Sequence, residues 1–372
     1  MHRDSGFVLV DHPQPHVALV TLNRPERMNS MAFDVMVPLK EVLAELTYDN
    51  SVRVVVLTGA GRGFSSGADH KSAGSVPHVA GLTRPTYGLR SMELLDDVIL
   101  AMRKLHQPVI AAVNGAAIGG GLCLALAADI RVAAGDAYFR AAGINNGLTA
   151  SELGLSYLLP RAIGASRAFE IMLTGRDVDA EEAERIGLVS RQVPAEDLLP
   201  TCYEIAERIA AFSRPGTELT KRTLWTGLDA STLEGHMQAE GLGQLYVRLL
   251  TANFEEAVAA RAAETAKKVA AQPAGDAPDT AAAGRFALYS SVPAGTEAAE
   301  PAKPAAKKSS APAPEVAEFL DYDNLTLAQL RAKIRTVDVD DLRVLADYER
   351  SARNRTPFVT MLENRIAAKS DR

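Results

Sequence analysis

Residues 108–128 read PVIAAVNGAAIGGGLCLALAA, in which three consecutive glycines, Gly119, Gly120 and Gly121, separate two apolar runs. The first run, residues 109–113, is typical of a buried strand, and the second is typical of a helix. A strand that turns through glycines straight into a helix directs unpaired backbone N–H groups and the positive end of the helix dipole at one point. The stretch therefore predicts a site that stabilises negative charge.

The composition is that of a globular protein with a slight acidic excess. The chain has 372 residues, 47% of them hydrophobic, and a formal net charge of −6. Its length allows one large and one small domain, and its charge argues against nucleic acid as the main partner. Its two cysteines, Cys123 and Cys202, argue against a disulfide framework. We therefore expect a cytoplasmic protein without a signal peptide or a membrane span.

Residues 1–271 read as one α/β domain, in which apolar strands alternate with amphipathic helices. The strands that we expect to be buried on both faces are residues 16–22, 52–58, 109–113 and 130–133. Between the first two we expect a helix over residues 31–48, for which Asn29 and Ser30 are the capping candidates.

The composition changes towards the end of the chain. Residues 272–314 are rich in Ala, Pro, Gly, Ser and Lys and bury too little apolar surface to offset their ordering entropy, so we expect a disordered linker. Residues 315–372 predict a small module of three short helices, one beginning at a capping box of Thr326 and Gln329 and the next at Asp338. A module of this size is marginal alone, and docking to a protein partner would stabilise it.

A second glycine-rich loop follows the predicted strand at residues 52–58. It reads GAGRGFSSGAD over residues 59–69. Its spacing fits neither the dinucleotide-binding fingerprint nor the phosphate-binding P-loop, which argues against a nucleotide site. We interpret it as a second place where the backbone comes close to a ligand.

Together the two loops resemble those of the crotonase family, also called the enoyl-CoA hydratase/isomerase family. Further motifs follow in the family's order, namely LNRPE at residues 22–26, LPR at 159–161, LTGR at 173–176 and AEEAERIGLV at 180–189. The resemblance covers residues 7–271. It implies a ββα spiral core with a C-terminal helical segment and assembly into a homotrimer or hexamer. It also implies an acyl-CoA thioester as substrate, with coenzyme A as part of the substrate, no separate cofactor and no metal.

The resemblance also implies where the thioester binds. Its carbonyl oxygen would lie between the backbone N–H groups of Ala68 and Gly120, which form an oxyanion hole. Chemistry beside a thioester develops enolate-like charge on that oxygen, and fixed donors stabilise the charge without reorganisation. The neighbouring Gly67, Gly119 and Gly121 would allow close approach of the substrate.

Five further positions are candidates for contacts to the substrate or CoA, namely Arg24, Arg27, Asp69, His70 and Gly143. The two arginines would meet CoA phosphates, and exposed surface charge is the alternative interpretation. Asp69 is mostly structural in the family. His70 stands where an apolar residue is frequent, and a histidine there would titrate near neutral pH, although packing or surface roles are commoner for a lone histidine.

Both glutamates that hydratases of the family use as acid and base are missing from this chain. Cys123 and Gly143 occupy their positions. We interpret Cys123 as a core residue, because nothing near it in sequence lowers the pKa of its thiol. Asn145 and Asn146 lie near the second position, and unshifted amides are poor bases. Loop-turn asparagines are the simpler interpretation.

Glu152 stands at a third carboxylate position, which some dienoyl-CoA isomerases of the family use. We take it as the candidate acid/base of a lyase or isomerase, and one base favours isomerisation because it can remove and return the same proton. A structural alternative is that Thr149 and Glu152 form a capping box at a helix start. The alternative function is an acyl-CoA-binding protein with little turnover, whose C-terminal module recruits a partner.

Overall fold

The computed structural model describes residues 6–271 and, further along the chain, residues 314, 316–317, 322, 330, 333–334, 337–351 and 355–370. The chain divides into two compact units, residues 1–271 and 272–372. Residues 272–313 of the predicted linker lie outside the described residues, as does the predicted capping box of Thr326 and Gln329.

A six-stranded sheet in the order β1-β2-β3-β5-β7-β10 forms the centre of the first unit. Its strands are β1 (Val8–Gln14), β2 (Val17–Leu22), β3 (Val54–Gly59), β5 (Val109–Val113), β7 (Ile130–Ala134) and β10 (Arg191–Val193). All neighbours are parallel except β1 and β2. The four predicted strands are present with small shifts of their ends, and β3 and β5 are buried along their whole length, as expected.

A second sheet of four short strands, in the order β4-β6-β8-β9, lies beside the first. Its strands are β4 (Gly63–Ser65), β6 (Ala116–Ile118), β8 (Tyr138–Arg140) and β9 (Asp177–Asp179). Three of them each follow a strand of the large sheet directly, since β4 follows β3, β6 follows β5 and β8 follows β7. A long strand, a short strand and a helix therefore repeat along the chain, which is the expected ββα architecture. The parallel pairing of β4 with β6 brings the two glycine-rich loops together.

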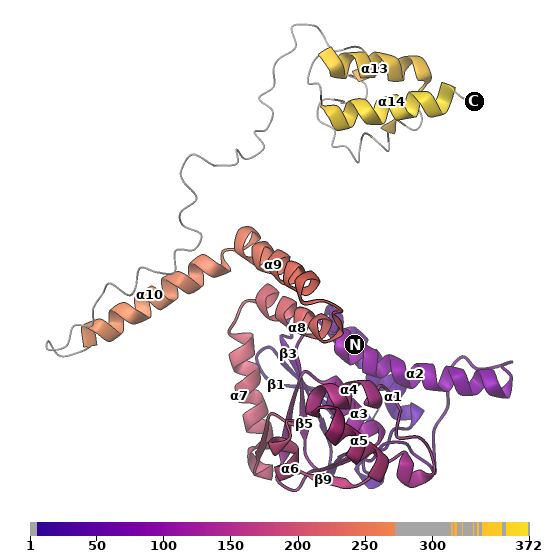
Figure 1. Ribbon diagram of the computed structural model, residues 1–372, viewed down its shortest axis with the longest axis vertical. Helices are drawn as coiled ribbons and strands as arrows, with labels where there is room; N and C mark the ends of the chain where they lie inside the picture. Colours follow the sequence, from indigo (N-terminus) through magenta and orange to yellow (C-terminus); the bar gives the residue numbers. More distant parts are fainter. Residues whose placement is uncertain are drawn as a thin grey trace. The chain divides into compact units, whose positions relative to one another are not determined.

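Helices cover both faces of the large sheet (Figure 1). Those that pack around the sheets are α1 (Phe33–Tyr48), α2 (Arg84–Lys104), α3 (Gly120–Ala127), α4 (Leu155–Ile163), α5 (Ala165–Thr174), α6 (Ala180–Arg185) and α7 (Leu198–Ala210). On one face α7 contributes Leu198 and Cys202 to a cluster with Val54, Val56 and Ile110. The larger core lies on the other face, where α1, α2 and α3 pack. Three further helices end the unit, namely α8 (Arg214–Asp229), α9 (Leu233–Leu250) and α10 (Asn253–Ala271).

The predicted caps of the first helix are wrong. Helix α1 begins at Phe33, and its N-cap residue, Ala32, provides no side-chain hydrogen bond. The Asn29 amide instead donates to the Gly63 carbonyl at 2.7 Å, and Ser30 donates to the Asp69 carboxylate at 3.1 Å. Both side chains bond to the loop that carries Ala68 rather than to the helix start.

The second unit has an apolar core of its own. Its described residues include the helices α13 (Val339–Ser351) and α14 (Thr356–Ser370). Asp338 accepts a hydrogen bond from the Asp341 N–H at 2.8 Å, which confirms the predicted helix start. The buried Glu349 carboxylate pairs with Arg355 at 2.8 Å, and the Arg355 guanidinium lies 3.7 Å from the centre of the Phe358 ring. The core residues of this unit include Tyr322, Leu330, Ile334, Leu342, Leu345, Phe358 and Leu362.

Among the described helices, none combines the length and the apolar character that crossing a membrane requires.

The contact between α3 and β4 predicts that adding one methyl group at Gly121 strongly lowers the stability of the fold. A Cβ atom at Gly121 would lie 2.1 Å from the Ser65 carbonyl oxygen, whereas one at Gly88, in α2, would meet nothing within 4 Å. We expect Gly121→Ala to lower the free energy of unfolding by about 3 kcal/mol and Gly88→Ala to raise it by about 0.5–1 kcal/mol. Urea denaturation measures both, and equal stabilities of the two variants would contradict this packing.

Candidate active site

The two glycine-rich loops meet where β4 and β6 end. A Cβ atom at Gly67 would lie 2.5 Å from the Ile118 carbonyl oxygen and 3.1 Å from the Gly120 nitrogen. Gly67 and Gly119 have φ angles of +77° and +53°. Residues other than glycine rarely adopt this region of backbone conformation. The structure therefore places Ala68, the residue after Gly67, beside the start of α3, as the resemblance implies.

The backbone N–H groups of Ala68 and Gly120 are the expected oxyanion-hole donors. Neither donates a hydrogen bond to another of the described residues. Gly120 is the first residue of α3, so its N–H lacks a partner in the helix and lies at the positive end of the helix dipole. The Gly119 N–H donates to the Arg140 carbonyl at 2.8 Å, which fixes the turn before the helix.

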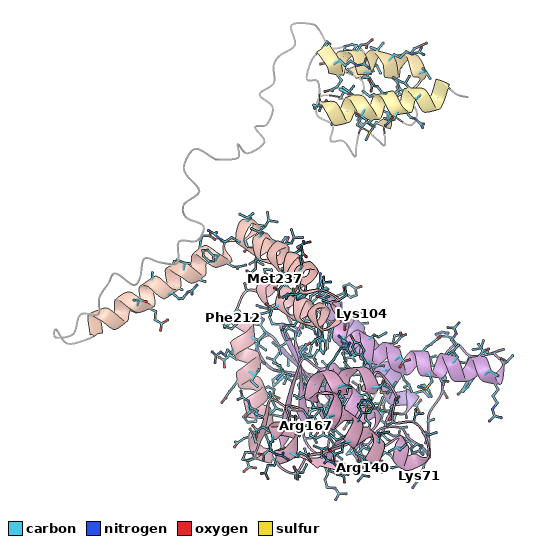
Figure 2. The ribbon with its side chains drawn as sticks, viewed as in Figure 1. Lys71, Lys104, Arg140, Arg167, Phe212 and Met237 are labelled. Atoms are coloured by element: carbon cyan, nitrogen blue, oxygen red, sulfur yellow. The ribbon has the colours of Figure 1, made fainter. Side chains whose placement is uncertain are left out.

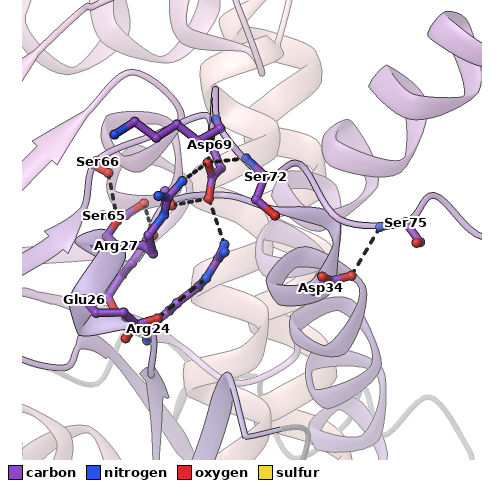
Figure 3. A network of polar contacts seen from close by, with 12 residues as sticks. Arg24, Glu26, Arg27, Asp34, Ser65, Ser66, Asp69, Ser72 and Ser75 are labelled. Atoms are coloured by element: carbon purple, nitrogen blue, oxygen red, sulfur yellow. Dashed lines mark hydrogen bonds and ion pairs between the residues drawn. The ribbon is translucent and has the colours of Figure 1, made fainter.

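Asp69 fixes the loop that carries Ala68 (Figure 3). The donors to its carboxylate are Arg24 at 2.9 Å, Arg27 at 2.5 Å, Ser30 at 3.1 Å, and the N–H groups of Lys71 and Ser72 at 2.9 Å each. Burial by itself raises the pKa of Asp69, but the hydrogen bonds, that of Arg27 foremost, hold it well below its usual range. Asp69 is therefore ionised and acts as a structural centre, in agreement with the family pattern.

Arg24 and Arg27 are predicted CoA contacts, and the structure shows both guanidinium groups paired with Asp69. They lie in and next to the short helix η1 (Pro25–Arg27). Their ion pairs tie this helix to the Ala68 loop. A contact of either arginine with CoA stays a prediction, as does one of His70, whose side chain is exposed.

Glu152 lies at the turn formed by Gly119, Gly120 and Gly121, which we call the glycine turn. Its Oε1 atom is 3.1 Å from the place where a Cβ atom at Gly119 would stand, one residue away from Gly120. The capping-box alternative is wrong, because α4 begins only at Leu155 with Gly154 as its N-cap. The Thr149 hydroxyl donates to the Ser151 carbonyl at 3.3 Å instead. The Glu152 side chain is thus not used to cap a helix.

The environment of Glu152 suits a general base. The side chain is partly buried, and burial raises its pKa above the ordinary value of 4.5, while the charge of His70 acts in the opposite direction. A carboxylate in a partly dehydrated position near oriented donors is a frequent arrangement in active sites.

Sequence reasoning missed two residues that enclose the turn. A Cβ atom at Gly120 would lie 2.3 Å from Met31 Sδ and 3.3 Å from Leu153 Cδ1. Both side chains therefore pack against Gly120. Met31 also donates its N–H to the Gly67 carbonyl at 2.7 Å. In the sequence, Met31 and Leu153 are ordinary apolar residues. The one signal is Gly154, since a glycine after Leu153 indicates a backbone conformation that other residues rarely adopt.

The positions at which hydratases carry glutamate hold no carboxylate. Cys123 is completely buried in α3, which confirms it as a core residue, and burial raises the pKa of its thiol well above the usual value. A Cβ atom at Gly143 would lie 1.9 Å from the Thr149 carbonyl oxygen, so this backbone leaves no room for a side chain there. Asn145 donates to the Gly175 carbonyl at 3.1 Å, a structural contact.

Across the described part of the chain, no group of three or more His, Cys, Asp or Glu residues is arranged to hold a metal ion.

A large cavity of the first unit lies elsewhere. It has a volume of about 1040 Å³ and is lined mainly by α8, α10 and α4, together with the ends of α7 at Ile209 and of α3 at Leu126. None of the proposed site residues lines it. Phe212, which does, lies on the opposite side of the unit from Lys71, which follows the Ala68 loop (Figure 2). The glycine turn remains the candidate active site, because the expected N–H donors and the Glu152 carboxylate lie near one another there.

Comparison with known proteins settles the family. The family model of enoyl-CoA hydratase/isomerase matches residues 13–267. The chain belongs to the enoyl-CoA hydratase/isomerase family. A second family model, a domain of unknown function (DUF8129), matches residues 316–371. The predicted crotonase-type α/β fold is thereby confirmed, together with the additional C-terminal region.

Three mycobacterial relatives are similar to this chain over most of its length. A probable enoyl-CoA hydratase, echA12, of Mycobacterium bovis is 85% identical over 261 residues, which are 70% of this chain and 92% of the relative. The crystal structure of a probable enoyl-CoA hydratase/isomerase from Mycobacterium abscessus is 73% identical with a TM-score of 0.67, over 70% of this chain and 96% of that one. A monofunctional enoyl CoA isomerase from M. smegmatis is 72% identical with a TM-score of 0.54, over 63% and 99%.

The Asp69 network predicts a large loss of stability when its centre is removed. We expect Asp69→Ala to lower the free energy of unfolding by about 3–5 kcal/mol, because two half-buried arginines lose their counter-charge. The control is Asp97→Ala, which removes the exposed pair with Lys40 and should change stability by less than about 1 kcal/mol. Thermal or urea denaturation compares the two, and equal losses would show that Asp69 does not hold the loop.

Proposed function

We propose that the first unit binds an acyl-CoA thioester and shifts the double bond of an enoyl-CoA, with Glu152 as its acid/base group. The observation that carries the proposal is the place of Glu152 Oε1, 3.1 Å from the Cβ position of Gly119. A thioester oxygen bound by the Ala68 and Gly120 N–H groups would have its α carbon close to this carboxylate. No separate cofactor is needed for such a reaction.

The chemistry requires one base. Glu152 takes a proton from the α carbon of a β,γ-enoyl-CoA, and the electron pair moves into a dienolate whose negative oxygen lies in the hole. Protonated Glu152 then returns that proton to the γ carbon, which leaves the double bond between the α and β carbons. No atom is gained or lost, so the reaction is an isomerisation.

Hydration fits this site less well than isomerisation. Adding water needs one group to activate the water and another to deliver a proton. The second position is closed, because the Thr149 carbonyl fills the space beside Gly143. The M. smegmatis relative that is 72% identical is named a monofunctional enoyl CoA isomerase, which supports the same reaction here. Other relatives, such as echA12 of Mycobacterium bovis, are named as probable enoyl-CoA hydratases.

The C-terminal helices of the first unit support self-association. Helix α9 has no buried residue, and Leu242, Leu249 and Leu250 are each at least 70% exposed. A helix of this kind gains most of its stability from packing. A homotrimer or hexamer, as in the family, would cover these side chains. Each subunit would then carry one copy of the second unit. A protein partner for that unit stays a prediction, as does the cytoplasmic location of the protein.

The second candidate is an acyl-CoA-binding protein with little turnover, whose C-terminal module recruits a partner. The missing carboxylates at Cys123 and Gly143 favour it, and the free N–H groups fit either function. Turnover decides between the two.

We expect Glu152→Gln to lower kcat for conversion of a β,γ-enoyl-CoA by about 10²–10⁴-fold, because the proton carrier is lost. KM should change little, since the oxyanion-hole donors are backbone groups. The control is Glu181→Gln, an exposed residue of α6, which should leave kcat unchanged. Full activity of Glu152→Gln would refute its role as the base, and tight acyl-CoA binding by an inactive wild type would establish the second candidate.

The raised pKa of Glu152 predicts the pH dependence. The base works only when ionised, so kcat/KM should fall as the pH drops through a pKa above the ordinary 4.5. Because the charge of His70 lowers that pKa, His70→Gln should move the acid limb to higher pH. A pH–rate profile of both proteins measures this. An acid limb that does not move in His70→Gln would contradict the electrostatic contact.

A further inference from the structure

The backbone after Glu152 is strained. Leu153 has a φ of +44° and Gly154 a φ of +78°, so two consecutive residues adopt the left-handed conformation. For a residue with a side chain this conformation is unfavourable, and it persists only where the surroundings enforce it. Something in the fold therefore holds the chain in this conformation beside the proposed base.

Three contacts hold the turn. The Glu152 carbonyl accepts the Leu155 N–H at 2.7 Å, which closes the turn itself. It also accepts the Cys123 thiol proton at 3.5 Å, which ties the turn to α3. The Leu153 side chain is 7% exposed and packs over Gly120. The turn is thus bound to the same helix that provides the oxyanion-hole donor.

One turn of α3 connects the donor and the base. The Cys123 N–H donates to the Gly119 carbonyl at 3.1 Å, and the Cys123 thiol donates to the carbonyl of Glu152. Gly120, between Gly119 and Cys123, carries the free N–H. The separation between the oxyanion hole and the carboxylate is therefore set by a short series of contacts within a buried core.

We propose that Cys123 and Leu153 are positioning residues, which hold Glu152 at the working distance from the oxyanion hole through the thiol hydrogen bond and the packed left-handed turn. This inference rests on the proposed isomerase function. The inference explains why a cysteine can serve at the position where hydratases carry a glutamate. The Cys123 thiol donates to the Glu152 carbonyl, whereas an ionised carboxylate has no proton to donate. A carboxylate there would also place a second negative charge beside Glu152.

The test compares Cys123→Ala with Cys123→Ser and with Cys202→Ala. Cys202 is the other buried cysteine, and it lies in α7 in a different apolar cluster. We expect Cys123→Ala to lower kcat at least tenfold, since small misplacements of a catalytic group have effects up to about 10²-fold. KM and the binding of a saturated acyl-CoA should stay unchanged. Cys123→Ser keeps a donor and should retain most of kcat, and Cys202→Ala should retain all of it.

The pH profile separates positioning from general damage. In Cys123→Ala the less constrained Glu152 gains solvent, so the acid limb of kcat/KM should move to lower pH, while melting temperatures of the two alanine variants stay similar. Leu153→Val, β-branched and disfavoured at positive φ, should lower kcat more than the volume-conserving Leu153→Met.

Equal kcat values for Cys123→Ala and Cys202→Ala would overturn the role of the thiol, and so would a loss in Cys123→Ser as large as that in Cys123→Ala. Equal kcat values for Leu153→Val and Leu153→Met would overturn the role of the turn. A wild type that binds acyl-CoA without converting it would instead refute the proposed function, and the positioning role with it.

Discussion

The close backbone contact between Gly67, in the Ala68 loop, and the glycine turn at Gly119 and Gly120 is the constraint on which the rest of the site depends. No side chain fits between these two segments, since a Cβ atom at Gly67 would reach both the Ile118 carbonyl and the Gly120 nitrogen. The contact exists because β4 and β6 pair in parallel and end side by side. Two loops far apart in the sequence thereby meet at the start of α3.

Each half of this contact is fixed by a different kind of interaction. The Ala68 loop is fixed by charge, through the buried Asp69 carboxylate and its two arginines. The α3 half is fixed by apolar packing in the large core, where Cys123 is completely buried. For the proposed function, this arrangement would hold the two donors in place before substrate arrives, which is what stabilisation of an enolate oxygen requires. Glu152 adds the one partly buried carboxylate that we assign to proton transfer.

Much of this arrangement was predictable, because its signals are local. Apolar runs predict the strands of the large sheet, and the glycine spacing predicts both loops. Asn29 and Ser30 were wrongly assigned as caps, because their partners, Gly63 and Asp69, lie more than thirty residues away. The capping box at Glu152 failed for a related reason, since the left-handed turn at Leu153 and Gly154 delays the helix. The clash that closes Gly143 arises where the chain folds back on itself between Gly143 and Thr149.

The most direct test of the account is a crystal structure of the protein with a bound saturated acyl-CoA. The account predicts that the thioester oxygen lies within hydrogen-bond distance, about 3 Å, of both the Ala68 and the Gly120 nitrogen. It also predicts that Glu152 is the one carboxylate that faces the α carbon. A thioester bound in the cavity lined by α4, α8 and α10, or at the glycine turn with another carboxylate at its α carbon, would contradict it.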